Sequence, residues 1–324
     1  MSKVSKAVKV WLIVAASLVL GGALIFGGAM MALNWSFLGF STVNCETNSY
    51  DIEANFKDIS IVTNTADIVF VPTEGVERMV VCSEHVKEKH FVKVIDRTLI
   101  IELEDTRKWY DYIGIGWGGG SKITVYMPAG EYGSLFVKSS TGKLELPEEF
   151  TFESIDVSKS TGNVTSRASA SGLIKIKTST GHITLENVSA GALDLRASTG
   201  NITATGIDCK GEMEVEVSTG KVELSDVICR TLDSEGDTGD ILLRNVVAGG
   251  VLSIERSTGD VTFDGSDAAE MFIETDTGDV KGTLLSDKVF IVRTDTGKVD
   301  VPKSVVGGRC EIETDTGNIK ITVN

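Results

Sequence analysis

Four Asp-Thr-Gly triplets are the residues of this sequence best suited to catalysis. They begin at Asp237, Asp276, Asp295 and Asp315. An aspartic protease carries the same triplet and works by placing two carboxylates where they share one proton. In this chain, however, six further Thr-Gly pairs carry serine in place of the aspartate, at the same spacing. The triplet therefore belongs to a longer repeat, and the geometry of that repeat explains it better than catalysis does.

The aspartates in and beside these triplets suggest a second kind of site, one for a cation. Carboxylates stacked about 5 Å apart repel one another unless calcium or another cation lies between them. Aspartate is also a common corner residue, because its side chain accepts hydrogen bonds from neighbouring amides. The sequence thus offers calcium candidates with a structural alternative. The candidates are Asp237, Asp240, Asp260, Asp276, Asp279, Asp295 and Asp315.

The rest of the sequence shows no recognisable catalytic or cofactor-binding motif. His85, His90 and His182 are scattered without metal-ligand spacing, which predicts surface residues. There is no glycine-rich phosphate loop and no nucleophile elbow. The chain has 46 Asp and Glu against 31 Lys and Arg, a net charge of −15, which argues against nucleic acid as a partner.

The Thr-Gly pair recurs ten times between Thr141 and Thr316, always 19 or 20 residues after the previous one. Apolar residues stand six and four positions before the repeat threonines and three positions after them, except for Ser234 before Thr238, with mostly polar residues between them. That alternation is typical of strands. Each unit therefore reads as a strand, a corner, a second strand and a return segment, and residues 131–324 are predicted to form an all-β parallel solenoid of ten coils.

Stacking of the coils must supply the stability that one coil lacks. Ordering about 19 residues costs roughly 20 to 40 kcal/mol of backbone entropy, whereas burying four apolar side chains returns roughly 6 to 12 kcal/mol. If each coil lies on the next in chain order, parallel strands pair along the axis and the inward side chains form one core. The corner glycine, Gly220 for example, is expected to have a positive φ.

The amino terminus has the pattern of a membrane anchor. Lys3, Lys6 and Lys9 precede a stretch without charged residues, and 10–33 is long enough to cross a bilayer as a helix. The positive-inside rule then places residues 1–9 in the cytoplasm and the solenoid outside the cell membrane, after a juxtamembrane linker over 34–52. A cleaved secretory signal is the alternative.

Residues 53–130 are predicted to form an irregular cap over one end of the solenoid. Residues 59–70 reproduce the coil pattern around Thr65, with strands expected at 91–95, 98–103 and 122–127. The segment 104–121 interrupts them and is rich in aromatic residues, which either form a binding surface or seal the cap. The candidates for partner binding are Trp109, Tyr110, Tyr112 and Trp117.

Five cysteines occur in the chain. Cys209 and Cys229 each lie ten residues after a repeat threonine, so they are expected to stack on adjacent coils, with a disulfide as the less favoured outcome. Cys310 occupies an inward position and is expected in the core. Cys45 and Cys82 have no assigned partner.

These repeats resemble the toast-rack, or putative-adhesin, family, a domain of unknown function found in membrane-anchored proteins of Gram-positive bacteria. The resemblance covers about 55–324 and rests on the Ser-Thr-Gly units and on the strand Ile123-Thr-Val-Tyr-Met-Pro128 ahead of the first one. It implies an extracytoplasmic β-solenoid without catalytic residues, in members associated with envelope-stress systems.

The sequence favours a non-catalytic interaction or structural module at the cell envelope. It would be held in the membrane by the amino-terminal helix, and its partner would be an envelope protein or a glycan. A regulatory partner of an envelope sensor is the first alternative. A glycan-active enzyme is the second, although spacings of 19 and 20 residues leave no room for the long loops that build a catalytic cleft.

Overall fold

The computed structural model describes residues 6–32, 45–85, 88–105 and 120–324. These residues fall into two compact units, of which the first contains the helix α1 (Lys6–Ala32) and the second contains almost all of the strands. The sequence predicts a membrane-spanning helix over 10–33. The side chains of α1 are described only in part, and within the described residues no helix is both long and apolar enough to cross a membrane.

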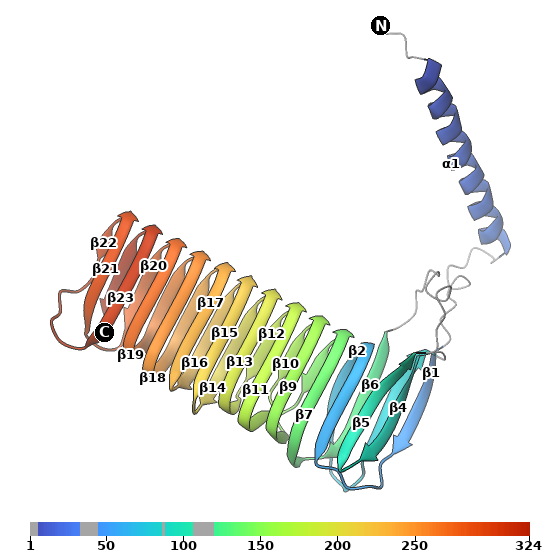
Figure 1. The fold of residues 1–324 in the computed structure, drawn as a ribbon, viewed down its shortest axis with the longest axis horizontal. Coiled ribbons are helices and arrows are strands. Elements are labelled where there is room, and N and C mark those ends of the chain that lie inside the picture. The colour runs from blue at the N-terminus through green and yellow to red at the C-terminus, as the bar shows by residue number, and fades with distance from the viewer. Residues whose placement is uncertain (1–5, 33–44, 86–87, 106–119) are drawn as a thin grey trace. The chain divides into compact units, whose positions relative to one another are not determined.

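The strands of the second unit wind into a stack of coils joined as one sheet (Figure 1). The amino-terminal strands are β1 (Cys45–Asp51), β2 (Asp58–Thr73), β3 (Met79–His85), β4 (Glu88–Ile95), β5 (Thr98–Asp105) and β6 (Ser121–Pro128). The strands of the coils are β7 (Gly130–Thr141), β8 (Leu144–Leu146), β9 (Phe150–Thr161), β10 (Val164–Ser166), β11 (Ser169–Thr180), β12 (Ile183–Glu186), β13 (Ser189–Thr199), β14 (Ile202–Cys209), β15 (Glu212–Thr219), β16 (Val222–Cys229), β17 (Thr231–Thr238), β18 (Ile241–Thr258), β19 (Val261–Thr277), β20 (Val280–Leu284), β21 (Lys288–Thr296), β22 (Val299–Asp300), β23 (Gly308–Thr316) and β24 (Ile319–Val323).

The repeat threonines set the register of the stack. Thr161 pairs with Thr141 on one side and with Thr180 on the other, in parallel strands. The column continues through the middle coils, where Thr219 pairs with Thr199 and Thr238. Thr65 pairs with Thr141, so the segment around Thr65 is a further coil at the amino-terminal end. The predicted parallel β-solenoid is confirmed.

The order of the last coils differs from the order of the chain. β19 pairs with β23, and β23 pairs with β21, so the coil of Thr316 lies between the coils of Thr277 and Thr296. The expectation that every coil lies on the previous one is therefore wrong at the final step. The chain turns back after β22, and Gly307, at φ 100°, and Gly308 lie where an added Cβ would overlap the carbonyl oxygens of Asp287 and Ala269. Only glycine leaves room for this return.

Cysteine pairs on the solvent-facing side of these strands should report the exchanged order. Glu274 pairs with Glu313, and Glu313 pairs with Arg293. Paired α-carbons lie about 4.8 Å apart, within the range that a disulfide allows. In a Cys45→Ser background, Glu274→Cys with Glu313→Cys should form a disulfide on mild oxidation, and Glu274→Cys with Arg293→Cys should not. Non-reducing peptide mapping measures both, and the reverse result would restore the sequential order.

The core lies inside the coils, at the positions that the alternation predicts. Ile174, Ile176 and Ile183 in the middle of the stack are fully buried, whereas Phe290 and Val292 are only partly buried. The difference has a simple cause, because β21 belongs to the terminal coil and has a neighbouring coil on one side only.

The corners depend on the glycine column. From Gly142 to Gly259 the corner glycines have φ values between 116° and 150°, a region that side chains disfavour. At Gly220 an added Cβ would overlap the carbonyl oxygen of Gly200 and lie 2.6 Å from its carbonyl carbon. Close stacking of successive corners therefore requires glycine on steric grounds as well as on conformational ones.

The amino-terminal end of the stack is built differently. β5 pairs with the first half of β2 in parallel, and β6 pairs with its second half. β4 then pairs with β5 and β3 with β6, both antiparallel. The strands expected at 91–95, 98–103 and 122–127 fall within β4, β5 and β6. Antiparallel pairs thus lie at this end of the stack, and their role as a cap stays a prediction.

Candidate functional site

The aromatic residues proposed for partner binding cannot be placed. Trp109, Tyr110, Tyr112 and Trp117 lie outside the described residues. The candidate sites below are therefore built from the coils and from the amino-terminal strands.

The aspartates proposed for calcium separate into two columns. Asp240 and Asp260 lie just after their corners, and each accepts a hydrogen bond from the backbone N–H of the next coil, at 3.2 and 2.9 Å. Asp279 does the same for the backbone N–H of Asn318, at 2.7 Å. Lys281 adds an ion pair to Asp260 at 2.6 Å and helps to hold the pKa of that carboxyl below its ordinary value. This column fastens one coil to the next.

The second column, which precedes the repeat threonines, is exposed. It contains Asp237, Asp276, Asp295 and Asp315, the first residues of the Asp-Thr-Gly triplets. Asp295 pairs with Arg293 at 3.0 Å on the same strand. The triplets thus lie at solvent-facing corners of a solenoid. Among the described residues, the one group of side chains close enough to share a metal ion lies elsewhere, and the calcium assignment stays a prediction.

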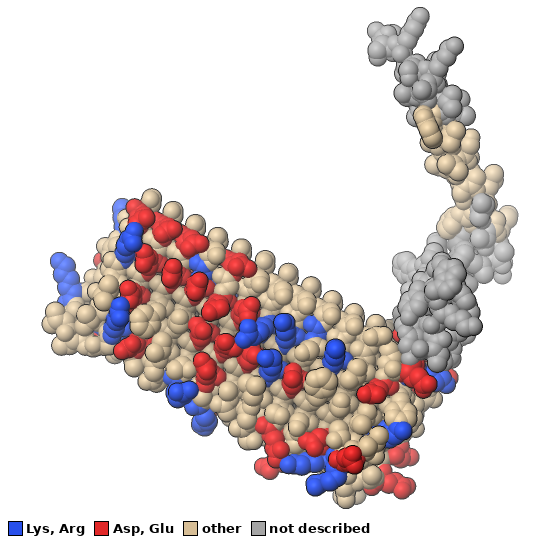
Figure 2. Space-filling view, viewed as in Figure 1, with Lys and Arg blue, Asp and Glu red and all other residues tan. Residues whose placement is uncertain are grey.

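The outer face of the sheet carries a run of glutamates on five neighbouring strands. Glu216 pairs with Glu235, Glu235 with Glu255, Glu255 with Glu274 and Glu274 with Glu313. We call these five residues the glutamate ladder. Each stands three positions before a repeat threonine and faces outward, and Figure 2 shows acidic side chains gathered over these coils. The sequence contains this spacing, although it was not among the predicted sites.

The ladder carries unfavourable like-charge contacts. The carboxylates of Asp233 and of the neighbouring glutamates raise the pKa of Glu235. At the amino-terminal edge, Arg196 binds Asp194 at 2.6 Å, Glu214 at 2.6 Å and also Glu216. Earlier in the same column stand Lys138 and Lys177, so the outer face changes from basic to acidic along the stack. Figure 2 shows the basic side chains beside the acidic ones.

Glu235→Gln should stabilise the protein slightly. Because the pKa of Glu235 is raised in the folded state, stability falls as the pH rises above the ordinary glutamate pKa of about 4.3. Neutralising the exposed side chain should therefore raise Tm by about 1–2 °C at pH 7 and low salt. The gain should vanish in 1 M NaCl and at a pH below 4, and a gain that survives both conditions would contradict the electrostatic cause.

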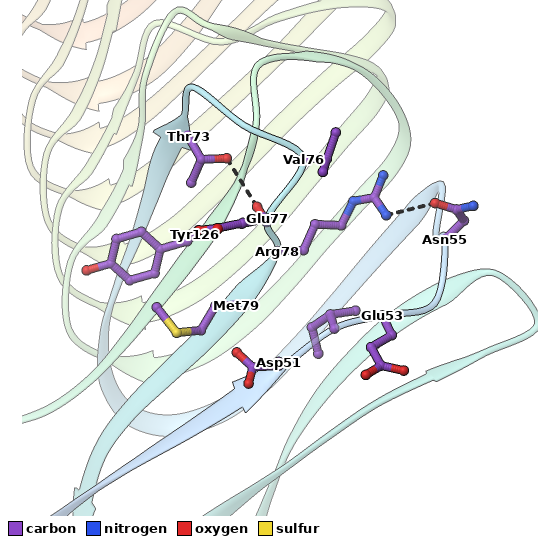
Figure 3. Close-up of a pocket in the computed structure, with 10 residues that line it drawn as sticks. Asp51, Glu53, Asn55, Thr73, Val76, Glu77, Arg78, Met79 and Tyr126 are labelled. Carbon is purple, nitrogen blue, oxygen red and sulfur yellow. Dashed lines mark hydrogen bonds between the residues drawn. The ribbon is translucent and has the colours of Figure 1, made fainter.

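A pocket of about 650 Å³ opens among the amino-terminal strands (Figure 3). Its walls come from the end of β1, the end of β2, the beginning of β3 and from β6. Arg78 donates to the Oδ1 atom of Asn55 at 2.8 Å and lies over the ring of Phe56, and Thr73 donates to the carbonyl of Glu77 at 3.1 Å. The lining residues are Asp51, Ile52, Glu53, Asn55, Thr73, Val76, Glu77, Arg78, Met79 and Tyr126. These groups could bind a ligand but form no catalytic arrangement.

A second group of polar side chains is buried between β3 and β4. His90 lies at its centre, and its Nδ1 is 2.6 Å from Glu84 Oε2 while its Nε2 is 2.8 Å from Thr63 Oγ1. Glu84 also accepts from Asn48 Nδ2 at 2.8 Å and from the backbone N–H of His90 at 2.7 Å. Cys82 lies beside them, and burial together with the Glu84 carboxylate raises the pKa of its thiol to about 12.

The sequence analysis did not predict this buried cluster. His90 was expected at the surface, yet it is 3% exposed. His182 is exposed as expected, and its Nδ1 accepts from the backbone N–H of Asn201 at 3.0 Å. One signal was present, because the apolar alternation that begins at Val80 places Cys82 and Glu84 on the same inward face. The approach of His90 on β4 to these two residues on β3 could not be read from spacing.

Thr63, His90 and Glu84 follow the hydroxyl, base and acid order of a nucleophilic triad. Thr63 is 4% exposed, Glu84 is 0% exposed and His90 is buried with them. A nucleophile must reach its substrate, so the burial of all three side chains favours a structural role.

Four of the five cysteines are buried, and Cys45 is exposed. Asp208 pairs with Ile228, immediately before Cys209 and Cys229, so the two thiols lie on adjacent coils as predicted. Both are free in the structure, and burial raises the pKa of Cys229 to about 12. Cys310 is fully buried, also as predicted.

The family model described as Toastrack DUF4097 matches residues 56–214 and 206–324. The two matches together span all of the coils. The chain belongs to this family. The family resemblance seen in the sequence is confirmed.

Two solved structures align with this chain over most of its length, at low sequence identity. One, described as a putative lipid binding protein from Parabacteroides distasonis, is 15% identical with a TM-score of 0.45, and the alignment covers 87% of this chain and 98% of that one. Another, a putative adhesin from Bacteroides fragilis, is 14% identical with a TM-score of 0.40, over 86% of this chain and 97% of that one. A comparison with curated proteins gave no match.

Proposed function

We propose that this Toastrack chain is a non-catalytic interaction module of the cell envelope and that its glutamate ladder binds a cationic partner surface. The ladder carries the proposal. Its positions face solvent, so the fold accepts any polar residue there, yet five neighbouring strands all present glutamate. Like charges about 5 Å apart reduce stability, and a partner with complementary charge would reverse that loss on binding.

The stacked coils support a binding role rather than a catalytic one. Their interior is filled by apolar side chains, and successive corners stack too closely for inserted loops. Binding surfaces on solenoids are extended faces of this kind. If this protein is instead a regulatory partner of an envelope sensor, it would use the same face, and the glutamate ladder would bind the sensor.

Membrane anchoring and an extracytoplasmic location are part of the proposal. Their support is in the sequence, where Lys3, Lys6 and Lys9 precede a stretch without charge that ends at Glu46. Protease added to intact cells should remove the region after Trp35. Protection of that region would overturn the proposed topology.

The ladder proposal is tested by neutralising three of its charges. Glu235→Gln, Glu255→Gln and Glu274→Gln together should weaken binding of the full chain to isolated cell envelopes by about tenfold at low salt, since each exposed charge pair contributes roughly 0.5 kcal/mol. The matched control replaces Glu145, Glu148 and Glu149, which are exposed on other parts of the solenoid, in the same way. Equal binding by the two triple variants would reject the ladder as the binding surface.

A further inference from the structure

The buried cluster between β3 and β4 contains three different metal-ligand side chains. Cys82, Glu84 and His90 each offer a ligand atom, and these atoms all lie within 4.8 Å of one another. We propose that these three residues form a binding site for a divalent ion of the zinc class. The proposal concerns the amino-terminal strands alone and is independent of the glutamate ladder.

The residue types suit such an ion. Zinc binds thiolate, imidazole and carboxylate groups, usually in a tetrahedron with bonds of about 2.0 to 2.3 Å. Atoms bound to the same ion therefore lie about 3.3 to 3.8 Å apart. Glu84 Oε2 and His90 Nδ1 are 2.6 Å apart and would separate slightly, while the sulfur would approach them. Each displacement is about 1 Å or less. A water molecule would complete the tetrahedron.

The groups around the three ligands would orient them. Asn48 donates to the Oε1 atom of Glu84 at 2.8 Å and leaves Oε2 directed at His90. Tyr50 donates to the carbonyl of His90 at 3.0 Å. When Nδ1 binds the ion, Nε2 carries the hydrogen, and the Thr63 hydroxyl 2.8 Å away can accept it. A ligand histidine usually donates its other ring N–H to such a partner.

Binding would be a proton exchange without a redox step. The ion displaces the hydrogen of the Cys82 thiol, which leaves to solvent as a proton, and the ring hydrogen of His90 lies on Nε2 once Nδ1 binds the ion. Beside a carboxylate alone, a buried thiol keeps its hydrogen, because burial disfavours the charged form. A dication adds positive charge at the same place and makes the thiolate favourable.

The position of the site gives the ion a structural effect. β3 pairs with β6, and β4 pairs with β5, so the two strands belong to different branches of the amino-terminal region. An ion held by Cys82 and Glu84 on β3 and by His90 on β4 would join these branches. We expect it to stabilise the region that covers the amino-terminal end of the core.

Cobalt provides a direct test because it replaces zinc and reports its ligands by absorption. The full chain, purified in detergent and treated with a chelator, should bind cobalt and develop a thiolate-to-cobalt band in the near ultraviolet together with tetrahedral bands in the visible. Zinc should displace both. Cys82→Ser should abolish the near-ultraviolet band and weaken binding at least 100-fold, while Asn48→Ala should weaken binding about 10-fold.

The matched control is Cys310→Ser, which alters a buried thiol distant in sequence and should leave the cobalt spectrum unchanged. Circular dichroism without metal confirms that each variant is folded, and Cys82→Ala serves if the serine variant is not. A folded wild-type chain without a thiolate band would overturn the proposal. So would a band that survives in Cys82→Ser or disappears in Cys310→Ser. In each case the cluster would be a hydrogen-bonded support for the strands only.

Discussion

Gly220→Val is expected to destabilise the protein by about 2 to 6 kcal/mol. The φ of Gly220 is 146°, which a β-branched residue tolerates poorly, and a Cβ would overlap the Gly200 carbonyl oxygen. Backbone strain costs about 1–3 kcal/mol, and forcing apart two stacked corners adds a similar amount. Denaturant titration measures the loss. Hydrogen exchange should show it concentrated in the middle coils, because each coil contacts only its neighbours.

The neighbouring residue supplies the control. The side chain of Lys221 is 68% exposed and pairs with Asp240 at 3.2 Å. Lys221→Ala should therefore change stability by less than about 1 kcal/mol. Equal tolerance of the two substitutions would mean that the corner is not tightly stacked, and the coil geometry would have to be revised.

His90→Leu is expected to cost about 3 to 5 kcal/mol, measured by denaturant titration with a chelator present so that no metal ion contributes. The substitution removes the ring that contacts the buried Glu84 carboxylate and leaves the Thr63 hydroxyl without this partner. A buried charge that loses its partner is strongly destabilising.

Two further variants distinguish the contribution of the buried charge to stability from the contribution of the hydrogen bonds. Thr63→Val removes only the hydroxyl and should cost about 1 to 2 kcal/mol. Replacing both Glu84 and His90 by leucine should cost less than the sum of the single changes, since the double variant contains no unpaired charge. Additive losses would show that the two side chains do not stabilise one another.

The repeat made most of the fold predictable. Apolar residues at fixed distances from each threonine place the strands, and the glycine after it fixes the corner, so Thr161 and Thr180 could be paired without coordinates. Inward positions were less predictable where they are polar. Arg256 is 1% exposed inside a corner and donates to the carbonyl of Val217 at 2.9 Å, with Gly236 leaving the space that it fills. The spacing of the repeat does not predict that a glycine on one coil makes room for an arginine side chain from the next.

Neither the order of the last coils nor the buried cluster could be predicted from the spacing of residues in the sequence, and the reason is the same for both. The units of Thr296 and Thr316 have the same pattern and nearly the same length as the others, so either order satisfies the apolar columns. Gly307 and Gly308 mark the return only once the path is known. Similarly, His90 lies beside Cys82 and Glu84 because β4 and β3 pair with other strands of the sheet, and no short motif encodes that arrangement. The sequence fixes local conformation well, whereas pairing between distant segments depends on the whole fold.

A photoreactive amino acid introduced at single positions of the full chain on intact cells would test the central claim most directly. The account predicts that a probe at Glu235, in the middle of the glutamate ladder, forms a discrete covalent adduct whose yield falls with rising salt. A probe at Glu145, equally solvent-facing but outside the ladder, should form none. Adducts of equal yield from both positions, or an adduct from Glu145 alone, would contradict a binding role for the ladder.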